Sequence, residues 1–440
     1  MLFHRIPSFT GNQEFRKYLF NTAWMIGEKA FTMGVLLVVS IFVARHLGAE
    51  GYGVLSYAFS LGTLFAMATH MGLHGLAVRE LVRHPDDQKL LLGTMFSLKF
   101  AAGVLAFLLF LTLVFLTETP GSTPYYTLLI LSGIILLKPF EVFDFWFQAR
   151  VIARFSSFSR IIAGLLFAGT SFFLILKDAQ VPAFASAYLI QAGFTALLFS
   201  LFFVLKSGHP PPLLHFQKEK AKKLLSESWM ILLAAVFAMV YLKIDQVMLR
   251  WMIGSTEVGL YSVAVQLSEA WYFIPSMIAA SIFPKLIELK KDQPEQYQIR
   301  LQQLIDLLFL AALGVAVFIS LLSRPLIAFL YGVEYESSSL FLSIHIWAGI
   351  FIFMRAAFSK WILIENAVIF SMITQGLGAL CNVLLNLLLI PAFEGTGAAL
   401  TTVFSYAMAS YFALLFHSKT RPMFWMMTRA FTAPFRLRMS

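Results

Sequence analysis

The sequence predicts an all-α polytopic membrane protein, with about twelve transmembrane helices arranged as two six-helix lobes around a central cavity. Of its 440 residues, 59% are hydrophobic and 13% are charged. A soluble chain of this length could not cover so much apolar surface, whereas a lipid bilayer accommodates it. Twelve apolar stretches of about 20 residues or more, each long enough to cross the hydrocarbon core, lie at 20–45, 53–80, 90–117, 123–148, 155–177, 181–206, 224–252, 257–284, 299–323, 337–362, 366–391 and 396–417.

The positions of the basic residues predict that both termini are cytoplasmic. With that orientation the inside segments contain 23 Lys and Arg residues, and the outside segments contain four: Arg45, Lys177, Arg250 and Arg324. Lys and Arg accumulate on the cytoplasmic side of membrane proteins. The net charge of +10 therefore follows from topology, and we expect no nucleic-acid partner.

One hydrophilic segment divides the chain near its middle. The linker "KSGHPPPLLHFQKEKAKK", residues 206–223, combines a proline run with a lysine cluster. Such a basic stretch is expected to rest on anionic lipid headgroups at the cytoplasmic surface. We therefore expect an N-terminal six-helix lobe (1–205), a C-terminal six-helix lobe (224–418) and a basic cytoplasmic tail (419–440).

The two halves are weakly similar to each other. "LGAEGYGVLSYAFSL" from Leu47 aligns without gaps with "IGSTEVGLYSVAVQL" from Ile253. The alignment joins helices 1 and 2 to helices 7 and 8. It indicates halves of the same orientation, related by an axis along the membrane normal. The identical pairs are Gly48 with Gly254, Gly53 with Gly259, Ser56 with Ser262, Ala58 with Ala264 and Leu61 with Leu267.

Three segments carry a resemblance to a known family: "VARHLGAEGYG", "KIDQVMLRWMIGSTEVGLYSVAVQL" and "NLLLIPAFEGTGAAL". In their order and spacing the chain resembles the Wzx/RfbX-like polysaccharide flippases of O-antigen and capsule assembly. These belong to the multidrug/oligosaccharidyl-lipid/polysaccharide exporter superfamily. The chain departs from the family pattern at Glu394, where a glycine usually stands three residues after Pro391.

The resemblance covers nearly the whole chain and implies a MATE-like fold and a function. Such proteins move an oligosaccharide, linked through pyrophosphate to a polyprenol, between the leaflets of the cell inner membrane by alternating access. The expected partners are this lipid-linked oligosaccharide, membrane lipids, polysaccharide polymerase and glycosyltransferases. The nearest rival is a MATE-type exporter of small drugs or metabolites. A small cation would favour acidic cavity residues, and bases match or outnumber acids in the cytoplasmic half of the spans.

An anionic pyrophosphate needs a wet, cationic cleft, so intramembrane bases are the candidate substrate contacts. An alternative is that long basic side chains simply extend to the inner interface, and Lys99 and Arg160 are the most open to it. The predicted substrate-binding residues are Lys29, Lys243 and Arg355, with Arg45 and Arg79 at the two mouths and Gln266 on the polar face of helix 8.

Helix 7 carries two opposite charges that cannot pair with each other. Lys243 and Asp245 are two positions apart, so on a helix they point about 200° apart. Each must therefore find a partner on another helix or in water. Asp245 and Glu269 are predicted to couple an ion or to neutralise a nearby base. The coupling ion, Na⁺ or H⁺, stays open. Glu28 and His345 are further candidates to bind it, and a packing role is the alternative for His345. No other cofactor and no structural metal site are expected.

Helix 4 carries Lys138, Glu141 and Asp144 on one face. They predict a charge network inside the N-terminal lobe, in which Lys138 pairs with Glu141 and Asp144 meets Arg154 or Arg160. Exposure of the same residues to the central cavity is the alternative. The sequence contains no nucleotide-binding loop and no nucleophile motif, and its predicted outside loops are short. We therefore expect a transporter and no enzyme.

Overall fold

The computed structural model describes residues 12–213 and 215–436, with side chains from residue 20 onward. Arg5 and Arg438, which count among the predicted cytoplasmic charges, lie outside the described residues. Within those ranges the chain forms helices and no strand. The helices are α1 Asn12–Ala66, α2 His74–Arg83, α3 Gln88–Thr117, α4 Thr123–Leu137, α5 Val142–Ala149, α6 Arg154–Leu176, α7 Val181–Ser207, α8 Lys218–Met252, α9 Ser255–Glu269, α10 Phe273–Asp292, α11 Pro294–Tyr331, α12 Ser338–His345, α13 Ala348–Ile364, α14 Ile369–Ser410, α15 Arg421–Ala430 and α16 Ala433–Arg436.

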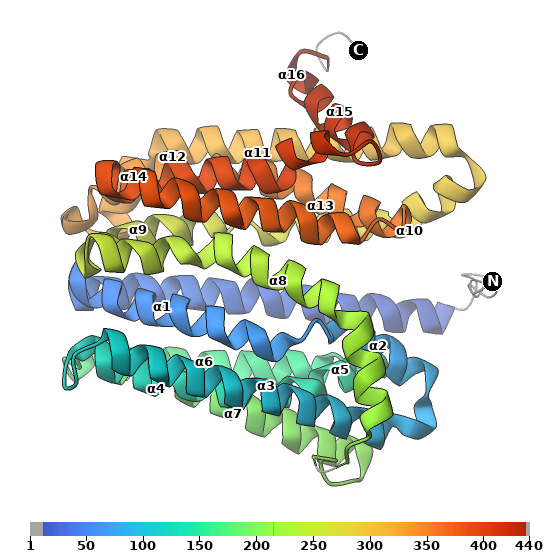
Figure 1. Cartoon of the computed structure of the whole chain (residues 1–440), viewed down its shortest axis with the longest axis horizontal. Helices are drawn as coiled ribbons and strands as arrows, with labels where there is room; N and C mark the ends of the chain where they lie inside the picture. The colour runs from blue at the N-terminus through green and yellow to red at the C-terminus, as the bar shows by residue number, and fades with distance from the viewer. Residues whose placement is uncertain (1–11, 214, 437–440) are drawn as a thin grey trace.

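All twelve predicted spans correspond to helices. Among the described residues, nine helical segments are long and apolar enough to cross a membrane. Two of them, Phe20–Arg83 and Ile369–Phe416, contain a reversal and each provide two crossings (Figure 1). The remaining crossing consists of α4 and α5, which the short 3₁₀ helix η3 Lys138–Glu141 connects.

The two reversals occur at residues with positive φ. Gly48 has φ +66°, a conformation that glycine adopts without penalty. The second reversal lies at Glu394, which has φ +50° and ψ −131°. The departure from the family pattern therefore does not abolish this turn. The glutamate instead adopts a strained backbone conformation, which costs about 1–3 kcal/mol.

Four crossings are interrupted near their middle, and they occupy matching places in the two halves. The second and fourth crossings are broken by the 3₁₀ helices η1 Met67–His70 and η3. The eighth and tenth are broken between α9 and α10 and between α12 and α13. Irregular backbone at membrane depth persists where protein or a polar cavity satisfies it. Charged and polar side chains stand at these breaks, among them Glu141, Glu269 and His345.

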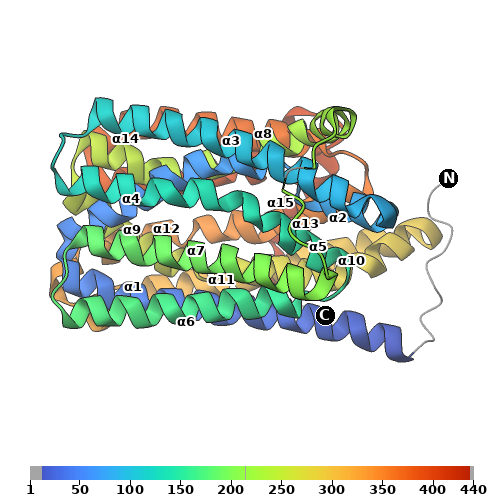
Figure 2. The same ribbon diagram turned by 90° about the horizontal axis from the view of Figure 1, so that it is seen from below.

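The halves lie side by side, with α8 between them in the view of Figure 1. In the N-terminal half α1 packs against α4, α6 and α7, and in the C-terminal half α14 packs against α8 and α13. Figure 2 shows α4, α6 and α7 running alongside the two arms of α1. Contacts between the halves concentrate where α1 meets α9, at the end of the bundle that contains Gly48. We call this the Gly48 end.

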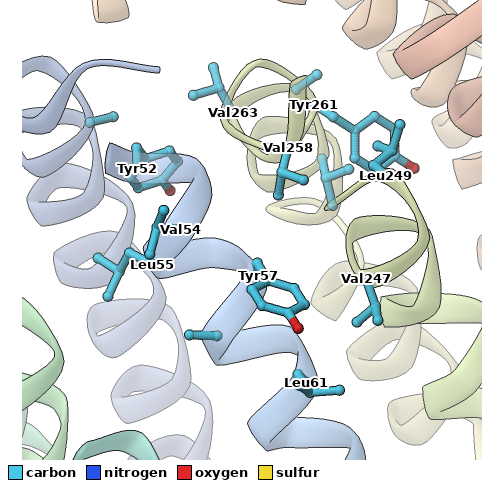
Figure 3. Close-up of a cluster of buried hydrophobic side chains, with 14 of the residues drawn as sticks. Tyr52, Val54, Leu55, Tyr57, Leu61, Val247, Leu249, Val258, Tyr261 and Val263 are labelled. Carbon is cyan, nitrogen blue, oxygen red and sulfur yellow. The ribbon is translucent and has the colours of Figure 1, made fainter. Parts of the chain in front are cut away.

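A buried apolar cluster holds the two halves together there (Figure 3). Tyr57 and Leu61 from α1 face Val247 and Leu249 from α8 and Val258 from α9. Tyr57, Val247, Leu249 and Val258 are all fully buried. Between helices in a membrane, close packing of such side chains and interhelical hydrogen bonds hold the helices together, so this packed surface joins the halves at the Gly48 end.

Candidate functional site

Matched glycines from the two halves touch at the Gly48 end. A Cβ atom on Gly53 would lie 1.8 Å from the carbonyl oxygen of Ser255. A Cβ atom on Gly259 would lie 1.9 Å from the carbonyl oxygen of Ala49. Ala49 and Ser255 are themselves matched in the internal alignment, so the contact is reciprocal. Backbones this close leave no space for a side chain, which explains glycine at both positions.

Hydrogen bonds reinforce this closed end. The guanidinium of Arg45 donates to the carbonyl oxygen of Phe329 at 2.6 Å, and the buried hydroxyl of Tyr335 donates to the carbonyl oxygen of Ala44 at 2.7 Å. Both bonds join α1 to the C-terminal half. The structure thus places Arg45, predicted to stand at a mouth, at the junction of the halves.

Gln266 is also tied to the opposite half. The hydroxyl of Tyr52 on α1 donates to Gln266 Oε1 on α9 at 2.7 Å. One further contact of this kind joins the hydroxyl of Ser60 to Gln246 on α8. These bonds lie between the two halves, so any separation of the halves at this level must break them.

Lys243 has a partner on the neighbouring helix. Its Nζ donates to Glu269 Oε2 at 3.0 Å, and the two side chains are 19% and 25% exposed. Glu269 is the last residue of α9, at one of the four helix breaks. Its other carboxylate oxygen is buried and has no hydrogen-bond partner among the described residues. The charges of Lys243 and Glu269 therefore neutralise each other, while Oε1 of Glu269 accepts no hydrogen bond from the described residues.

Asp245 lies deeper, in a cage of polar oxygen and amide groups. Its carboxylate accepts hydrogen bonds from Tyr261 at 2.9 Å, Asn386 at 2.7 Å and Thr402 at 2.5 Å. Asn386 also donates to Asn382 at 3.1 Å. The Oδ1 atom of Asn386 is buried without a partner among the described residues. Asp245 is 2% exposed, so α8, α9 and α14 together hold a buried carboxylate that forms no ion pair with any residue the structure describes.

Sequence reasoning identified Asp245 but assigned it no specific partners. Tyr261 and Asn386 lie within two of the segments that carry the family resemblance, and Asn382 stands four positions before Asn386 on one helical face. That spacing was the available signal for a shared site. Thr402 carried no comparable signal. Among the described residues, no group of three or more His, Cys, Asp or Glu side chains is arranged to hold a metal ion.

Two further predicted bases occupy very different surroundings. Arg355 is 9% exposed and donates to the carbonyl oxygen of Ala409 at 2.7 Å, near the end of α14. Lys29 is exposed on the first arm of α1. His345 is buried, with its Nδ1 2.9 Å from the hydroxyl of Ser268, which fits a packing residue.

Arg79 belongs to a contact between α2 and the start of α8. This contact lies at the end of the bundle opposite Gly48, and we call it the α2–α8 clasp. Close above it, a Cβ atom on Gly72 would lie 2.6 Å from the carbonyl oxygen of Ser228. The start of α8 is therefore docked on the N-terminal half. The ion pairs of the clasp are Arg79 with Glu227 and Lys223 with Glu80, and Lys220 adds a pair with Asp87, four residues beyond the end of α2.

The predicted network inside the N-terminal half is present. Lys138 pairs with Glu141 at 3.0 Å, and Arg160 pairs with Asp144 at 2.6 Å. Two residues join it that sequence reasoning did not assign to it: Lys99, 3.5 Å from Glu141, and Glu28, 3.5 Å from Arg160. The side chain of Lys99 is fully buried, so the alternative in which it extends to the interface is wrong.

Comparison with known proteins identifies relatives of this architecture. The family model described as polysaccharide biosynthesis protein matches residues 18–290, more than half of the chain. A putative O-antigen transporter of Shigella flexneri is 23% identical over 342 residues, which cover 72% of this chain and 78% of that protein. The resemblance proposed from the three sequence segments is confirmed.

Solved structures share the fold. The lipid II flippase MurJ in an inward closed conformation superposes with a TM-score of 0.69 at 15% identity, over 95% of this chain and 92% of that chain. An inward-facing multidrug resistance MATE family transporter of the MOP superfamily gives 0.64 at 14% identity, over 92% and 95%. The predicted MATE-like, all-α polytopic membrane fold is therefore confirmed.

Proposed function

We propose, since the chain belongs to the polysaccharide biosynthesis protein family, that it translocates a lipid-linked oligosaccharide from the cytoplasmic to the outer leaflet of the cell inner membrane. The observation that carries the proposal is the reciprocal contact of Gly53 and Gly259. Two similar halves that meet through such a contact are the arrangement that alternating access uses. The name of the Shigella relative, an O-antigen transporter, supports an oligosaccharide on a polyprenyl pyrophosphate as the cargo.

The proposed orientation places both termini in the cytoplasm and the Gly48 end outside. The halves are then closed towards the outside. Arg45 stands at the outer mouth and Arg79, within the α2–α8 clasp, at the inner one. Outward opening requires the halves to part between α1 and α9, which breaks the Arg45, Tyr52 and Gly53 contacts.

Lys243 is the base proposed to meet the cargo within the membrane. Its partner Glu269 holds it by a single ion pair that is partly exposed. A pyrophosphate carries more negative charge than one carboxylate and can displace it from the ammonium group. The released Glu269 then has two unsatisfied oxygens and takes up a cation or a proton. Cargo binding and ion binding are in this way coupled through one residue.

Asp245 is proposed as the principal site of the coupling ion. A buried carboxylate costs several kcal/mol when unpaired, and hard cations prefer carboxylate, amide and hydroxyl oxygens. Asn386 donates from its Nδ2 to Asp245, and the Oδ1 of the same side chain is a buried oxygen of this kind, unpartnered within the described part of the chain. This favours Na⁺ over H⁺. Asp245 and Lys243 both lie on α8, and the α2–α8 clasp holds the start of this helix against the N-terminal half. An ion bound at Asp245 can therefore affect the positions of both halves through α8.

The experiment that tests the function is leaflet-resolved. The protein is depleted in its host, and the polyprenyl-pyrophosphate-linked oligosaccharide is assayed on each face of the inner membrane. Accumulation on the cytoplasmic face, reversed by wild type and not by Lys243→Ala, is the expected result. Lys285→Ala serves as the matched control, since Lys285 pairs with Glu288 at 2.9 Å but both are exposed. Normal translocation with altered sensitivity to small cations would instead support the MATE-type exporter.

A further inference from the structure

A cavity of about 320 Å³ lies within the N-terminal half. Both arms of α1 line it, together with α4, η3, α6 and α7. The cavity is not sealed, because two of its lining residues, Leu36 and Phe59, are 37% and 41% exposed. It is separate from the Asp245 cage and the Lys243–Glu269 pair, whose residues belong to the C-terminal half.

The lining changes from charged to apolar along the helix axes. Arg160 stands six residues after the start of α6, or about 9 Å from that end. Gly164 and Phe167, which also line the cavity, follow at about 15 and 20 Å. The same order holds on the antiparallel fourth crossing, where Lys138 lies nearer the cytoplasmic end and Ile134 deeper. In the orientation proposed above, the charged part therefore faces the inner leaflet.

Two cations, Lys138 and Arg160, and one carboxylate, Glu141, reach this cavity. The side chains of Lys138 and Arg160 are 35% and 34% exposed, whereas those of Glu28 and Asp144 are 8% and 6% exposed. The two carboxylates thus lie behind Arg160. Glu141 also lines the cavity, but the buried Lys99 supports it from behind at 3.5 Å.

A further donor stands deeper in the wall. The side-chain amide of Gln191 on α7 lines the cavity and makes no hydrogen bond among the described residues. It is the kind of group that fixes the orientation of a ligand in a mostly apolar pocket. The cavity therefore offers cations at its cytoplasmic end, an uncommitted amide further in, and an apolar wall beyond the cations.

We propose that this cavity binds an inner-leaflet lipid, with its phosphate held by Lys138 and Arg160 and the start of its chain against Ile134, Gly164 and Phe167. The order of charged and apolar groups matches a lipid whose headgroup points to the cytoplasm. Two lipids share this chemistry: the polyprenyl pyrophosphate cargo, in which case the site rests on the proposed function, and a bulk anionic phospholipid that stays bound.

Native mass spectrometry of the detergent-solubilised protein tests the site. Phosphatidylglycerol and a polyprenyl pyrophosphate are titrated separately. Gly164→Leu adds a side chain to the cavity lining without removing a charge, and a Cβ on Gly164 meets no atom within 4 Å. Lys138→Gln removes one phosphate donor and leaves Glu141 paired with Lys99. We expect each variant to weaken lipid binding about tenfold, the effect of one charge-assisted hydrogen bond or of steric exclusion.

Two matched controls keep the result specific. Gly169→Leu adds the same side chain on the same helix outside the cavity, where a Cβ also meets nothing within 4 Å. Lys285→Gln removes the equivalent lysine of an exposed i,i+3 pair. Unchanged binding of both lipids by Gly164→Leu and Lys138→Gln would overturn the proposal.

The lipid that responds identifies the source. Loss of polyprenyl pyrophosphate binding alone makes the cavity a cargo subsite. Loss of phosphatidylglycerol binding makes it a resident lipid site. If depletion of the protein caused no accumulation of the lipid-linked oligosaccharide on the cytoplasmic face, the proposed function would be refuted. Binding of phosphatidylglycerol in this cavity would still support the lipid site.

Discussion

Gly53 and Gly259 occupy reciprocal positions across the junction of the two halves. Gly53 packs against the backbone carbonyl of Ser255, which lies four positions before Gly259. Gly259 packs against the backbone carbonyl of Ala49, which lies four positions before Gly53. The same register appears in the ungapped internal alignment. Two similar segments related by an axis produce such a paired contact, as an isologous interface does between identical subunits. The two segments that are similar in sequence therefore also form the contact between the halves.

Alanine at Gly53 or Gly259 should prevent closure at the Gly48 end. The added methyl group would overlap a backbone carbonyl, and overpacking of this kind costs about 1–3 kcal/mol. We expect the population to shift towards separated halves. A membrane-impermeant thiol reagent, applied from outside, should label Leu55→Cys in a Cys381→Ser background faster once Gly53→Ala is present.

Gly62→Ala is the matched control for this change. Gly62 stands on the same arm of α1, and a Cβ there meets no atom within 4 Å. It should leave labelling of Leu55→Cys unchanged. Equal labelling in all three proteins would show that the glycine contact does not govern closure.

Asp245→Asn should remove a Na⁺ effect on stability. The amide retains the shape of the carboxylate but loses its charge, so the cage no longer attracts a cation. For wild type, Na⁺ at ten times its Kd should raise the free energy of unfolding by about 1.4 kcal/mol. Thermal unfolding in NaCl and in KCl measures this difference. Asp306→Asn, which disrupts an ion pair with Arg436 on α16, should keep the Na⁺ effect. Identical unfolding of wild type in both salts would contradict a Na⁺ site.

Exchange of the charges of Lys243 and Glu269 should separate stability from transport. Glu269→Lys alone places two partly buried ammonium groups together and should destabilise the protein by about 1–3 kcal/mol. The double variant Lys243→Glu with Glu269→Lys restores the pair, so a double-mutant cycle should show recovery of unfolding free energy. We expect transport to stay low, because the cation has moved from α8 to α9. Full recovery of transport would mean that the pair has a structural role alone.

Glu394→Gly should stabilise the protein. The positive φ of this exposed residue strains a glutamate and suits a glycine, and relief of such strain contributes about 1 kcal/mol. Glu394→Ala serves as the control, since alanine keeps a Cβ atom and should give no gain. The unfolding midpoint of both variants measures the difference. A lower midpoint for the glycine variant would indicate that the side chain of Glu394 has a role of its own.

Much of the candidate site was accessible to sequence reasoning, but its contacts were not. The one-face spacing of Lys138, Glu141 and Asp144 predicted a network within the N-terminal half, which is present. The spacing of Lys243 and Asp245 correctly excluded a pair between them. It could not indicate that Lys243 would pair with Glu269, or that Asp245 would accept a hydrogen bond from Asn386, because those partners come from other helices. Arg355 illustrates the limit further, since its neighbour is the backbone of Ala409 on a helix that begins after it.

The sequence by itself determined that this is a membrane protein of about twelve spans in two similar halves, and it indicated the family. Those properties depend on apolar length and local motifs, which are summed residue by residue along the chain. The tertiary structure alone decided that Lys243 pairs with Glu269, where four spans break, and that Gly53 and Gly259 close one end. These depend on contacts between distant helices, where a shift of one turn changes every partner.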